Sequence, residues 1–312
     1  MAARREPCDD GCVNDTTIDP ADNNDLPESR LYTFVDEARE YALYFLEGQR
    51  LIRDLALLHA FRGGGFDYFR QTVLSIQPMI ALMKHGEQLG FYIDSNDPSY
   101  RLKIETNHEG DTRCTLVPDD FSVFPEAVHG LVRVERRFPQ GAPPYGTMRP
   151  PYQSFLAADG WPLKEMVNKV LSDSWQLPCR VLVTGRSDQS LMLHQLPALR
   201  SDDESRFSPE ALTARLDGLS DQLEEVLGKA LLDPDELVAA FQTLGFHPLA
   251  SRGVRLRCSC SREGVIHSLL LIDDPMGLFD PGQEEIDVSC EYCKRHYAIG
   301  RADLSPPPDL IH

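Results

Sequence analysis

The hydrophobic and polar positions between residue 31 and about residue 199 follow two periods, one helical and one extended. Apolar residues recur at helical spacing over 50–61, 66–84 and 161–174, which predicts three helices. Shorter stretches alternate or are rich in β-branched residues, and turn-forming residues separate them. These predicted strands are 89–93, 100–104 and 131–135, which form an antiparallel sheet, and the closing strands 180–183 and 191–193. The mixture predicts an α+β fold rather than a doubly wound one.

A narrow apolar seam marks the segment 201–249. Ser208 as N-cap and Pro209 as first residue open a helix, and Asp233 opens a shorter helix that ends near Gly245. The apolar positions of the seam, spaced alternately by four and three residues, are Leu212, Leu216, Leu219, Leu223, Val226 and Ala230. Eleven acidic against three basic side chains give the segment a net charge of −8. We expect the seam to rest on the main domain while the acidic face stays solvated, so that the segment can detach.

Composition divides the chain into five segments. The first carries eight acidic and three basic side chains and almost no large apolar residue, so we expect a disordered acidic tail. A mixed sheet-and-helix domain, a helical linker and a small cysteine-rich domain follow, and a proline run ends the fold in an extended tail. The predicted boundaries are 1–30, 31–200, 201–249, 250–304 and 305–312.

The overall charge narrows the classes of partner. The chain has 312 residues and a net charge of −18, with an isoelectric point near 4.9. This balance opposes the counterion release that drives binding to nucleic acids and anionic membranes, so we expect neither as a partner. No apolar run reaches the roughly 20 residues of a membrane-spanning helix, and the N-terminus lacks the apolar core of a secretory signal. We therefore expect a soluble, cytoplasmic protein.

The candidate chemistry lies in two close cysteine pairs, Cys258-Ser259-Cys260 and Cys290-Glu291-Tyr292-Cys293. Four thiolates in two short-spaced pairs match the ligand set of tetrahedral zinc, so all four cysteines are candidate Zn²⁺ ligands. One interpretation is a closed zinc ribbon in which the four cysteines have a purely structural role. The less common Cys-x-Cys spacing instead suggests thiols that leave the metal and pair with each other, which is redox chemistry. A thioredoxin-like oxidoreductase would place its Cys-x-x-Cys early in a βαβ unit, whereas this one lies near the end of the chain.

Basic residues surround the pairs in sequence and admit two interpretations. They either favour thiolate over thiol or form the exposed edge of strands. They are Arg255, Arg257, Arg262, Lys294 and Arg295. His296 follows closely and is expected to pack beside the site rather than bind the metal.

The remaining cysteines and the search for enzyme motifs provide no evidence of further chemistry. Cys8 and Cys12 fall in the acidic tail, and Cys114 and Cys179 lie in strand-like surroundings, so we expect all four to stand outside the chemistry. The run of three glycines that starts at Gly63 lacks the Lys-Ser/Thr of a phosphate-binding loop. There is no nucleophile elbow either, so we expect neither ATP-driven nor hydrolytic activity and predict that the protein is not an enzyme.

With these motifs the sequence resembles the heat-shock protein 33 family, the redox-regulated holdase chaperones of bacteria. The stretches 254–263 and 286–297, which contain the two cysteine pairs, resemble that family's zinc domain in order and spacing. Tyr152-Gln153 and the stretch 176–181 are similar to short family stretches, and the order of main domain, linker and zinc domain is the same.

The resemblance implies a protein that is inactive as a chaperone when reduced and zinc-bound and active when oxidised. In that scheme oxidation forms the disulfides Cys258–Cys260 and Cys290–Cys293 and zinc is lost. The linker then unfolds and binds unfolding client proteins, for which its apolar seam from Leu212 to Val226 is the candidate region. The resemblance also implies a homodimer when oxidised.

Three positions depart from the family pattern. Ser95-Asn96-Asp97-Pro98 stands where the family has a Gly-Asp-Gly-Pro turn, and Ser154 stands where it commonly has Gly after Tyr-Gln. Lys294 follows the last cysteine, where the family often has a small residue. The zinc site is intact in sequence, so the departures bear on client range and dimer geometry.

Overall fold

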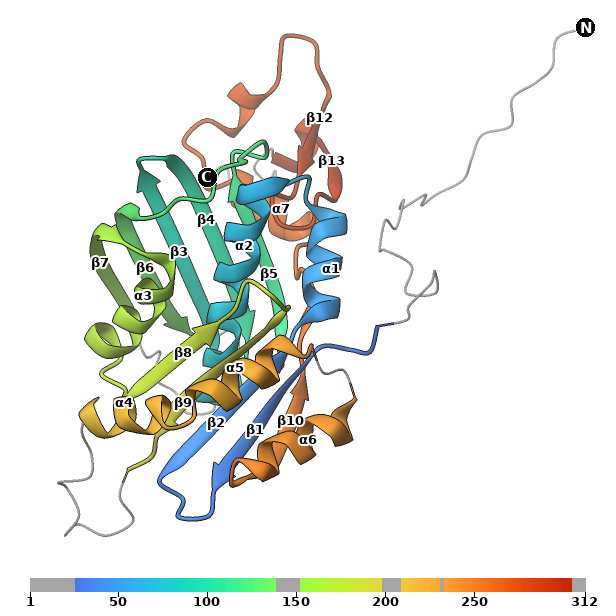
Figure 1. Ribbon diagram of the computed structural model, residues 1–312. Coiled ribbons are helices and arrows are strands. Elements are labelled where there is room, and N and C mark those ends of the chain that lie inside the picture. Colours follow the sequence, from blue (N-terminus) through green and yellow to red (C-terminus); the bar gives the residue numbers. More distant parts are fainter. Residues whose placement is uncertain (1–25, 139–151, 198–208, 231–232, 305–312) are drawn as a thin grey trace, which may run out of the picture.

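The computed structural model describes residues 26–138, 152–197, 209–230 and 233–304 and confirms a mixed α+β fold (Figure 1). Two large sheets and a small two-stranded sheet account for its strands. The predicted strands 89–93, 100–104 and 131–135 do lie in one sheet as antiparallel neighbours. The predicted closing strands 180–183 and 191–193 belong to the other large sheet.

The first large sheet is antiparallel throughout and has five strands. In spatial order they are β10 (Phe246–Gly253), β1 (Arg30–Asp36), β2 (Tyr41–Glu47), β9 (Gln189–Gln195) and β8 (Cys179–Val183). Every residue of β2 is buried, because this central strand is covered on both faces. Its nearly continuous apolar sequence is typical of such a strand.

The second large sheet has six strands. In order they are β11 (Arg255–Leu256), β5 (Asp111–Val117), β4 (Ser99–Asn107), β3 (Gln88–Asn96), β6 (Val128–Arg137) and β7 (Tyr152–Trp161). β11 pairs parallel with β5 and the other pairings are antiparallel. In β4 the apolar residues Tyr100, Leu102 and Ile104 are buried, whereas Lys103 and Glu105 alternate with them. One face of this sheet therefore carries the core and the other carries charge.

Helices fill the space between the two large sheets. They are α1 (Gln49–Leu58), α2 (Gly63–Ile76), the 3₁₀ turn η1 (Gln77–Leu82), α3 (Leu163–Lys169) and the π turn η2 (Val170–Ser174). Their apolar side chains share one continuous core with the inner faces of both sheets. The predicted helix over 66–84 changes to a 3₁₀ turn near Pro78, which lacks the N–H that continues an α-helix.

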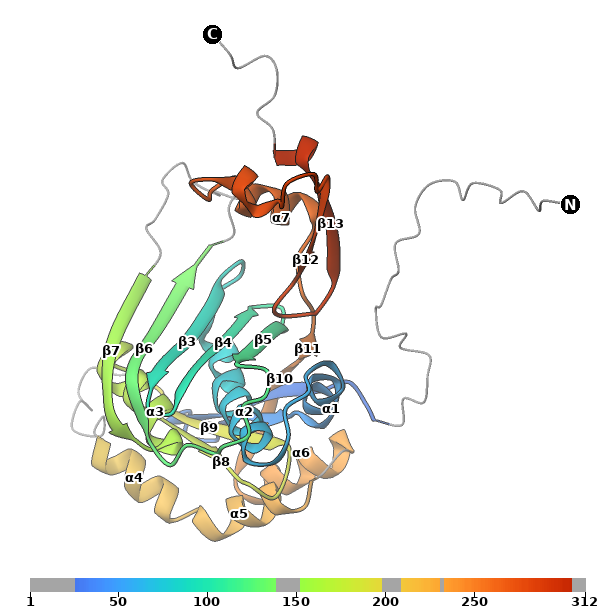
Figure 2. The ribbon, with the colours of Figure 1, turned by 90° about the horizontal axis from the view of Figure 1, so that it is seen from above.

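The linker segment covers the outer face of the first sheet (Figure 2). Its helices are α4 (Pro209–Asp217), α5 (Ser220–Gly228) and α6 (Pro234–Thr243). Asp233 caps α6 as predicted, accepting hydrogen bonds from the N–H groups of Asp235 and Glu236. The predicted first helix is broken between α4 and α5, and its Ser208 cap lies outside the described residues.

The apolar seam packs on the main domain as expected. Leu212, Leu219, Leu223 and Val226 are buried in a second core with Phe34, Phe45 and other residues of the first sheet, and Leu216 is partly buried beside them. The linker continues into β10, which crosses the predicted boundary at residue 249.

The C-terminal unit, residues 258–304, lies on the far side of the second sheet from α2 (Figure 2). It contains α7 (Arg262–Leu269), η4 (Pro275–Leu278), β12 (Glu285–Ser289), β13 (His296–Gly300) and η5 (Arg301–Leu304). Its own core has four buried hydrophobic residues, Phe279, Tyr297, Ile299 and Leu304. Across the described ranges of the chain, no helix is long and apolar enough to cross a membrane.

Candidate metal centre

The four cysteines of the C-terminal unit form one cluster of sulfur atoms. Cys258 and Cys260 follow β11, while Cys290 and Cys293 lie in the turn between β12 and β13. All four Sγ atoms lie within 4.8 Å of one another, and each side chain is half-buried. The closest contacts cross between the pairs, at 3.8 Å from Cys258 to Cys290 and 3.3 Å from Cys260 to Cys293. The tertiary structure thus brings the two predicted pairs to one point, with all four thiols free.

This donor set fits a zinc ion. Zn–S bonds of about 2.3 Å in a tetrahedron place sulfur atoms about 3.8 Å apart, and the measured separations of 3.3 and 3.8 Å are close to that spacing. The group found among the described residues consists of thiols alone. Thiolate ligands select soft or borderline metals such as zinc over magnesium or calcium.

Negative charge in the cluster concentrates on Cys290. Its pKa falls to about 4, foremost because the Cys258 thiol donates a hydrogen bond to its sulfur, and the N–H groups of Cys293 and Tyr292 add to this against the effect of burial. The pKa of Cys258 rises for the complementary reason, its hydrogen bond with Cys290, and because it is partly buried.

The turn that holds Cys290 and Cys293 is closed by its backbone. The N–H of Lys294 donates to the carbonyl of Cys290, and the N–H of Cys290 donates to the carbonyl of Arg295. Lys294 has a φ of 57°, in the left-handed region where glycine has no steric penalty. This explains why a small residue suits the position, and the lysine found here makes a contact that glycine lacks.

The basic residues near the pairs are mostly engaged with carboxylates. Four of these pairs and their distances are Arg255–Asp111 at 2.6 Å, Arg257–Asp111 at 3.4 Å, Arg262–Asp303 at 2.6 Å and Lys294–Asp119 at 3.1 Å. His296 contacts Asp287 at 2.7 Å on the surface and lies outside the sulfur group. Arg113 of β5, which the sequence analysis did not single out, brings its Nη1 atom to 3.8 Å from the Cys258 sulfur.

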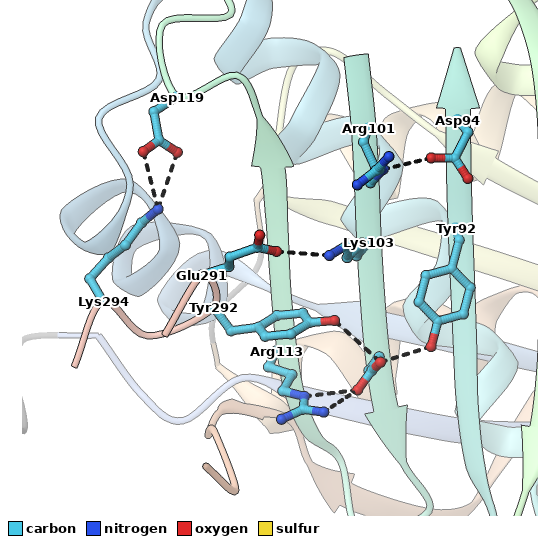
Figure 3. Close-up of polar contacts among 10 residues, drawn as sticks. Tyr92, Asp94, Arg101, Lys103, Arg113, Asp119, Glu291, Tyr292 and Lys294 are labelled. Atoms are coloured by element: carbon cyan, nitrogen blue, oxygen red, sulfur yellow. Dashed lines mark hydrogen bonds and ion pairs between the residues drawn. The ribbon is translucent and has the colours of Figure 1, made fainter. Parts of the chain in front are cut away.

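The same turn docks on the charged face of the second sheet (Figure 3). The Tyr292 hydroxyl donates to the Glu105 carboxylate at 3.2 Å, and the Arg113 guanidinium lies 4.5 Å over the Tyr292 ring. Glu105 also accepts from Arg113 at 2.5 and 2.8 Å and from the Tyr92 hydroxyl at 2.7 Å. We call Glu105, Arg113 and Tyr292 the knuckle contact.

Two ion pairs flank the knuckle contact. Lys103 of β4 lies 2.7 Å from Glu291, and Lys294 lies 3.1 Å from Asp119 (Figure 3). Burial alone would raise the pKa of Glu105, but Arg113, Tyr92 and the nearby Arg137 outweigh it and hold the pKa below its ordinary value. Glu105 is therefore an anion at neutral pH, suited to hold both the guanidinium and the Tyr292 hydroxyl.

This docking surface is not evident in the sequence. Lys103 was part of the predicted strand 100–104, and Glu105 lies just beyond its predicted end. A charged residue at every second position of such a strand is the only signal the sequence carries, and solvent exposure explains it equally well.

The other cysteines and the glycine run considered in the sequence do not belong to the metal centre. Cys114 and Cys179 are buried free thiols, and burial raises the pKa of Cys179 to about 12 and that of Cys114 further. Both are therefore inert as nucleophiles. Gly63 starts α2 in a left-handed conformation, with a φ of 56°. Cys8 and Cys12 lie outside the described residues.

Comparisons with known proteins agree on one family. The family model described as Hsp33 protein matches residues 29–300. A 33 kDa chaperonin of Pseudomonas fluorescens is 27% identical over 234 residues, which cover 73% of this chain and 76% of the relative. A 33 kDa chaperonin of Pseudomonas aeruginosa is 32% identical over 169 residues, covering 49% and 52%. The crystal structure of a 33 kDa chaperonin from Thermotoga maritima, a heat shock protein 33 homolog, has a TM-score of 0.65 at 13% identity, covering 89% of this chain and 97% of the other.

Proposed function

Because the chain belongs to the Hsp33 family, we propose that it is an ATP-independent holdase chaperone whose binding of unfolding proteins is switched on by oxidation of its four clustered cysteines. The family and the names of the relatives support a chaperone role. The redox control, the zinc and the cytoplasmic location are the proposed parts.

In the reduced state Cys258, Cys260, Cys290 and Cys293 hold Zn²⁺. The ion, when bound, cross-links the segment that follows β11 to the turn between β12 and β13. This cross-link matters because the C-terminal unit has only four buried hydrophobic residues. Structural zinc in finger-like peptides contributes about 10–16 kcal/mol to folding, more than burial supplies in a unit of this size.

Oxidation removes the ligands. In each pair two zinc-bound thiolates lose one electron each and form one S–S bond. One molecule of hydrogen peroxide takes up these two electrons and two protons from solvent and becomes two molecules of water. The pairings are Cys258–Cys260 and Cys290–Cys293, as the family resemblance implies. Disulfide sulfurs no longer donate as thiolates do, so the C-terminal unit loses its cross-link and unfolds.

The effect reaches the linker through the chain itself. Between α6 and Cys258 the chain contributes β10 to the edge of the first sheet and β11 to the edge of the second. Unfolding of the C-terminal unit removes the knuckle contact beside β11 and frees the end of this segment. α4, α5 and α6 then lose the strand that anchors them, because β10 connects them to that end.

Release of the linker uncovers two apolar surfaces. The seam from Leu212 to Val226 is one, and the outer face of the first sheet with Phe34 and Phe45 is the other. Exposed contiguous apolar surface binds other apolar segments, such as those of unfolding client proteins. The same surfaces provide the contacts of a homodimer in the oxidised state.

One observation carries this proposal. The cluster of four free thiols is separated by a short stretch of chain from the helices that cover the first sheet, and that stretch is paired at the edges of both large sheets. A chemical change at the sulfurs is therefore placed to alter the linker.

Aggregation of an unfolded client protein, followed by light scattering, tests the proposal. The full chain is added either reduced and zinc-loaded or after oxidation with peroxide at mild heat, and zinc release is measured in parallel. We expect suppression of scattering by the oxidised form only, together with loss of zinc. A Cys8→Ser/Cys12→Ser variant serves as a matched control, and we expect it to respond as the unaltered chain does.

Two results would contradict the redox switch. Equal suppression by both forms would indicate a constitutive binding protein with purely structural zinc. An oxidised sample that suppresses scattering while it keeps its zinc would separate chaperone activity from the metal.

A further inference from the structure

A cleft of about 400 Å³ lies where β6 ends and β7 begins. Its walls come from these two strand ends, from the turn after η2 and from the segment between η1 and β3. The volume falls within the range of small-molecule sites, roughly 300–1,000 Å³. Neither the cysteine chemistry nor the linker uses this cleft.

The floor of the cleft is fixed by a buried carboxylate. Glu87 is only 8% exposed. Its Oε2 accepts from the Arg136 guanidinium at 2.5 Å and from the backbone N–H of Lys84 at 2.8 Å. The Arg136 guanidinium in turn lies 4.9 Å over the ring of Trp175. Carboxylate, guanidinium and indole thus form a preorganised stack.

The cleft is locally basic in a chain of net charge −18. Three cationic side chains line it, against one carboxylate, Glu87. Arg136 is paired with Glu87, and Arg137 is paired with Glu105 at 3.2 Å. Within the described ranges, no carboxylate lies at ion-pair distance from the Lys84 ammonium, so Lys84 is the cation of the lining that is not already paired with a carboxylate.

Trp175 sits on an unusual backbone. It follows the π turn η2, and the next residue, Gln176, has a φ of 53°. π turns and left-handed non-glycine residues carry a conformational cost and recur at functional sites. The Trp175 Nε1–H is shielded from solvent and has no acceptor among the described residues.

Aromatic side chains supply the remaining walls. Phe138 and Tyr152 both line the cleft and are about half exposed, and the Tyr152 hydroxyl is fixed by a bond to the Ser174 carbonyl at 2.8 Å. Flat rings and a guanidinium plane favour stacking with a planar ligand. We infer that this cleft binds a small organic anion that carries an aromatic ring, with the anionic group at Lys84 and the ring against the aromatic walls.

Binding is measured on the full, reduced and zinc-loaded chain in a Trp161→Phe background. The chain has two tryptophans, so Trp175 is then the single indole reporter. Phenyl phosphate and benzoate are the probes, because each joins one ring to one anionic group. Inorganic phosphate tests the anion alone and benzyl alcohol tests the ring alone. We expect saturable changes in Trp175 fluorescence with one or both aromatic anions, and binding at least about tenfold weaker for the two partial probes.

Lys84→Met separates this site from nonspecific binding. The change keeps the length of the side chain and removes the free cation, and we expect about tenfold weaker binding of the aromatic anion. Lys164→Met is the matched control, since Lys164 is an exposed lysine on α3 outside the cleft, and it should leave binding unchanged. Arg137 is unsuitable as a test position because it also pairs with Glu105.

Three results would overturn the inference. They are the absence of saturable binding by either aromatic anion, equal binding of benzyl alcohol and the anions, and equal losses in the two lysine variants. Circular dichroism of each variant checks that folding is retained. Which anion binds more tightly distinguishes a phosphate from a carboxylate ligand.

Discussion

The main body and the C-terminal unit reach their folded states by different means. The main body buries a continuous core between two sheets and a second core under the linker helices. The C-terminal unit buries Phe279, Tyr297, Ile299 and Leu304 and little else. Burial scales with size, so we expect the larger region to be stable on its own, whereas the smaller would need the proposed zinc cross-link. In the proposed switch, oxidation of the cross-link in the smaller region would leave the larger one intact.

The linker helices lie between these extremes. They have no core without the first sheet, yet Leu223 and Phe241 are completely buried against it. Their acidic outer face adds nothing to that burial. The linker is therefore stable only while it stays docked, which couples it to whatever holds its ends.

Metal removal should separate the two regions most strongly. A chelator applied to the reduced protein should remove about 10–16 kcal/mol of apparent folding free energy from the C-terminal unit. Hydrogen exchange should then show that the amides of β12 and β13 lose protection while those of β3 and β4 keep it. Retained protection in β12 and β13 would mean that the small unit folds by burial after all.

Leu223→Ala tests whether docking of the linker on the first sheet contributes to the stability of the main body. The side chain is fully buried under the first sheet, so its truncation should cost about 2–5 kcal/mol in urea unfolding. Leu249→Ala is the control, because Leu249 is 70% exposed and should change stability by less than about 0.5 kcal/mol. We also expect the Leu223 variant to bind client protein while still reduced. Equal effects of both substitutions would show that the seam is not docked in solution.

Raising the pH should lower the free energy of unfolding of the main body, because Glu47 then ionises while it is buried. Burial raises the pKa of this carboxyl from 4.5 to about 7, although the Gln49 N–H bond opposes the shift. A raised folded pKa means that the contribution of Glu47 is complete below about pH 4.5 and is lost as the pH rises through about 7. Glu47→Gln should therefore stabilise the protein by about 1–3 kcal/mol more at pH 8 than at pH 5.

Urea unfolding at the two pH values measures this difference. The C-terminal unit should respond in the opposite direction, because thiolate ligands are protonated in acid and release metal as the pH falls. A Glu47→Gln variant with the same pH dependence as the unaltered chain would contradict the assignment to Glu47.

The smallest expected effect concerns the contact between the two regions. A double-mutant cycle of Glu105→Gln and Tyr292→Phe removes their hydrogen bond, which should give a coupling energy of about 0.5–1.5 kcal/mol. The exposed pair Lys103 and Glu291 serves as the comparison, and its cycle with Lys103→Met and Glu291→Gln should give about 0–1 kcal/mol. Rates of zinc transfer to a chelator provide the readout. A larger coupling for the exposed pair would mean that the knuckle contact does not hold the unit.

Local signals predicted several elements of this molecule but not β1, β2, β5 or β7. The cap at Asp233 and the apolar positions of the linker depend on residues a few positions apart, and the structure contains both. β10 was not predicted, because it is an edge strand with mostly exposed residues and no alternating pattern. The strands β8 and β9 were predicted, but the sheet they join was not, since periodicity marks a strand without naming its partner.

The sequence by itself determined that four cysteines in two close pairs were available as a metal-binding set and that an amphipathic acidic linker preceded them. Only the tertiary structure decided that Tyr292 meets Glu105 and Arg113, that β10 and β11 join different sheets, and that Lys84 and Trp175 line one cleft. The physical reason is the distance along the chain over which each kind of interaction acts. Caps, spacings and periodicities act over a few residues, whereas strand pairing and contacts between charges far apart in sequence depend on the path of the whole chain.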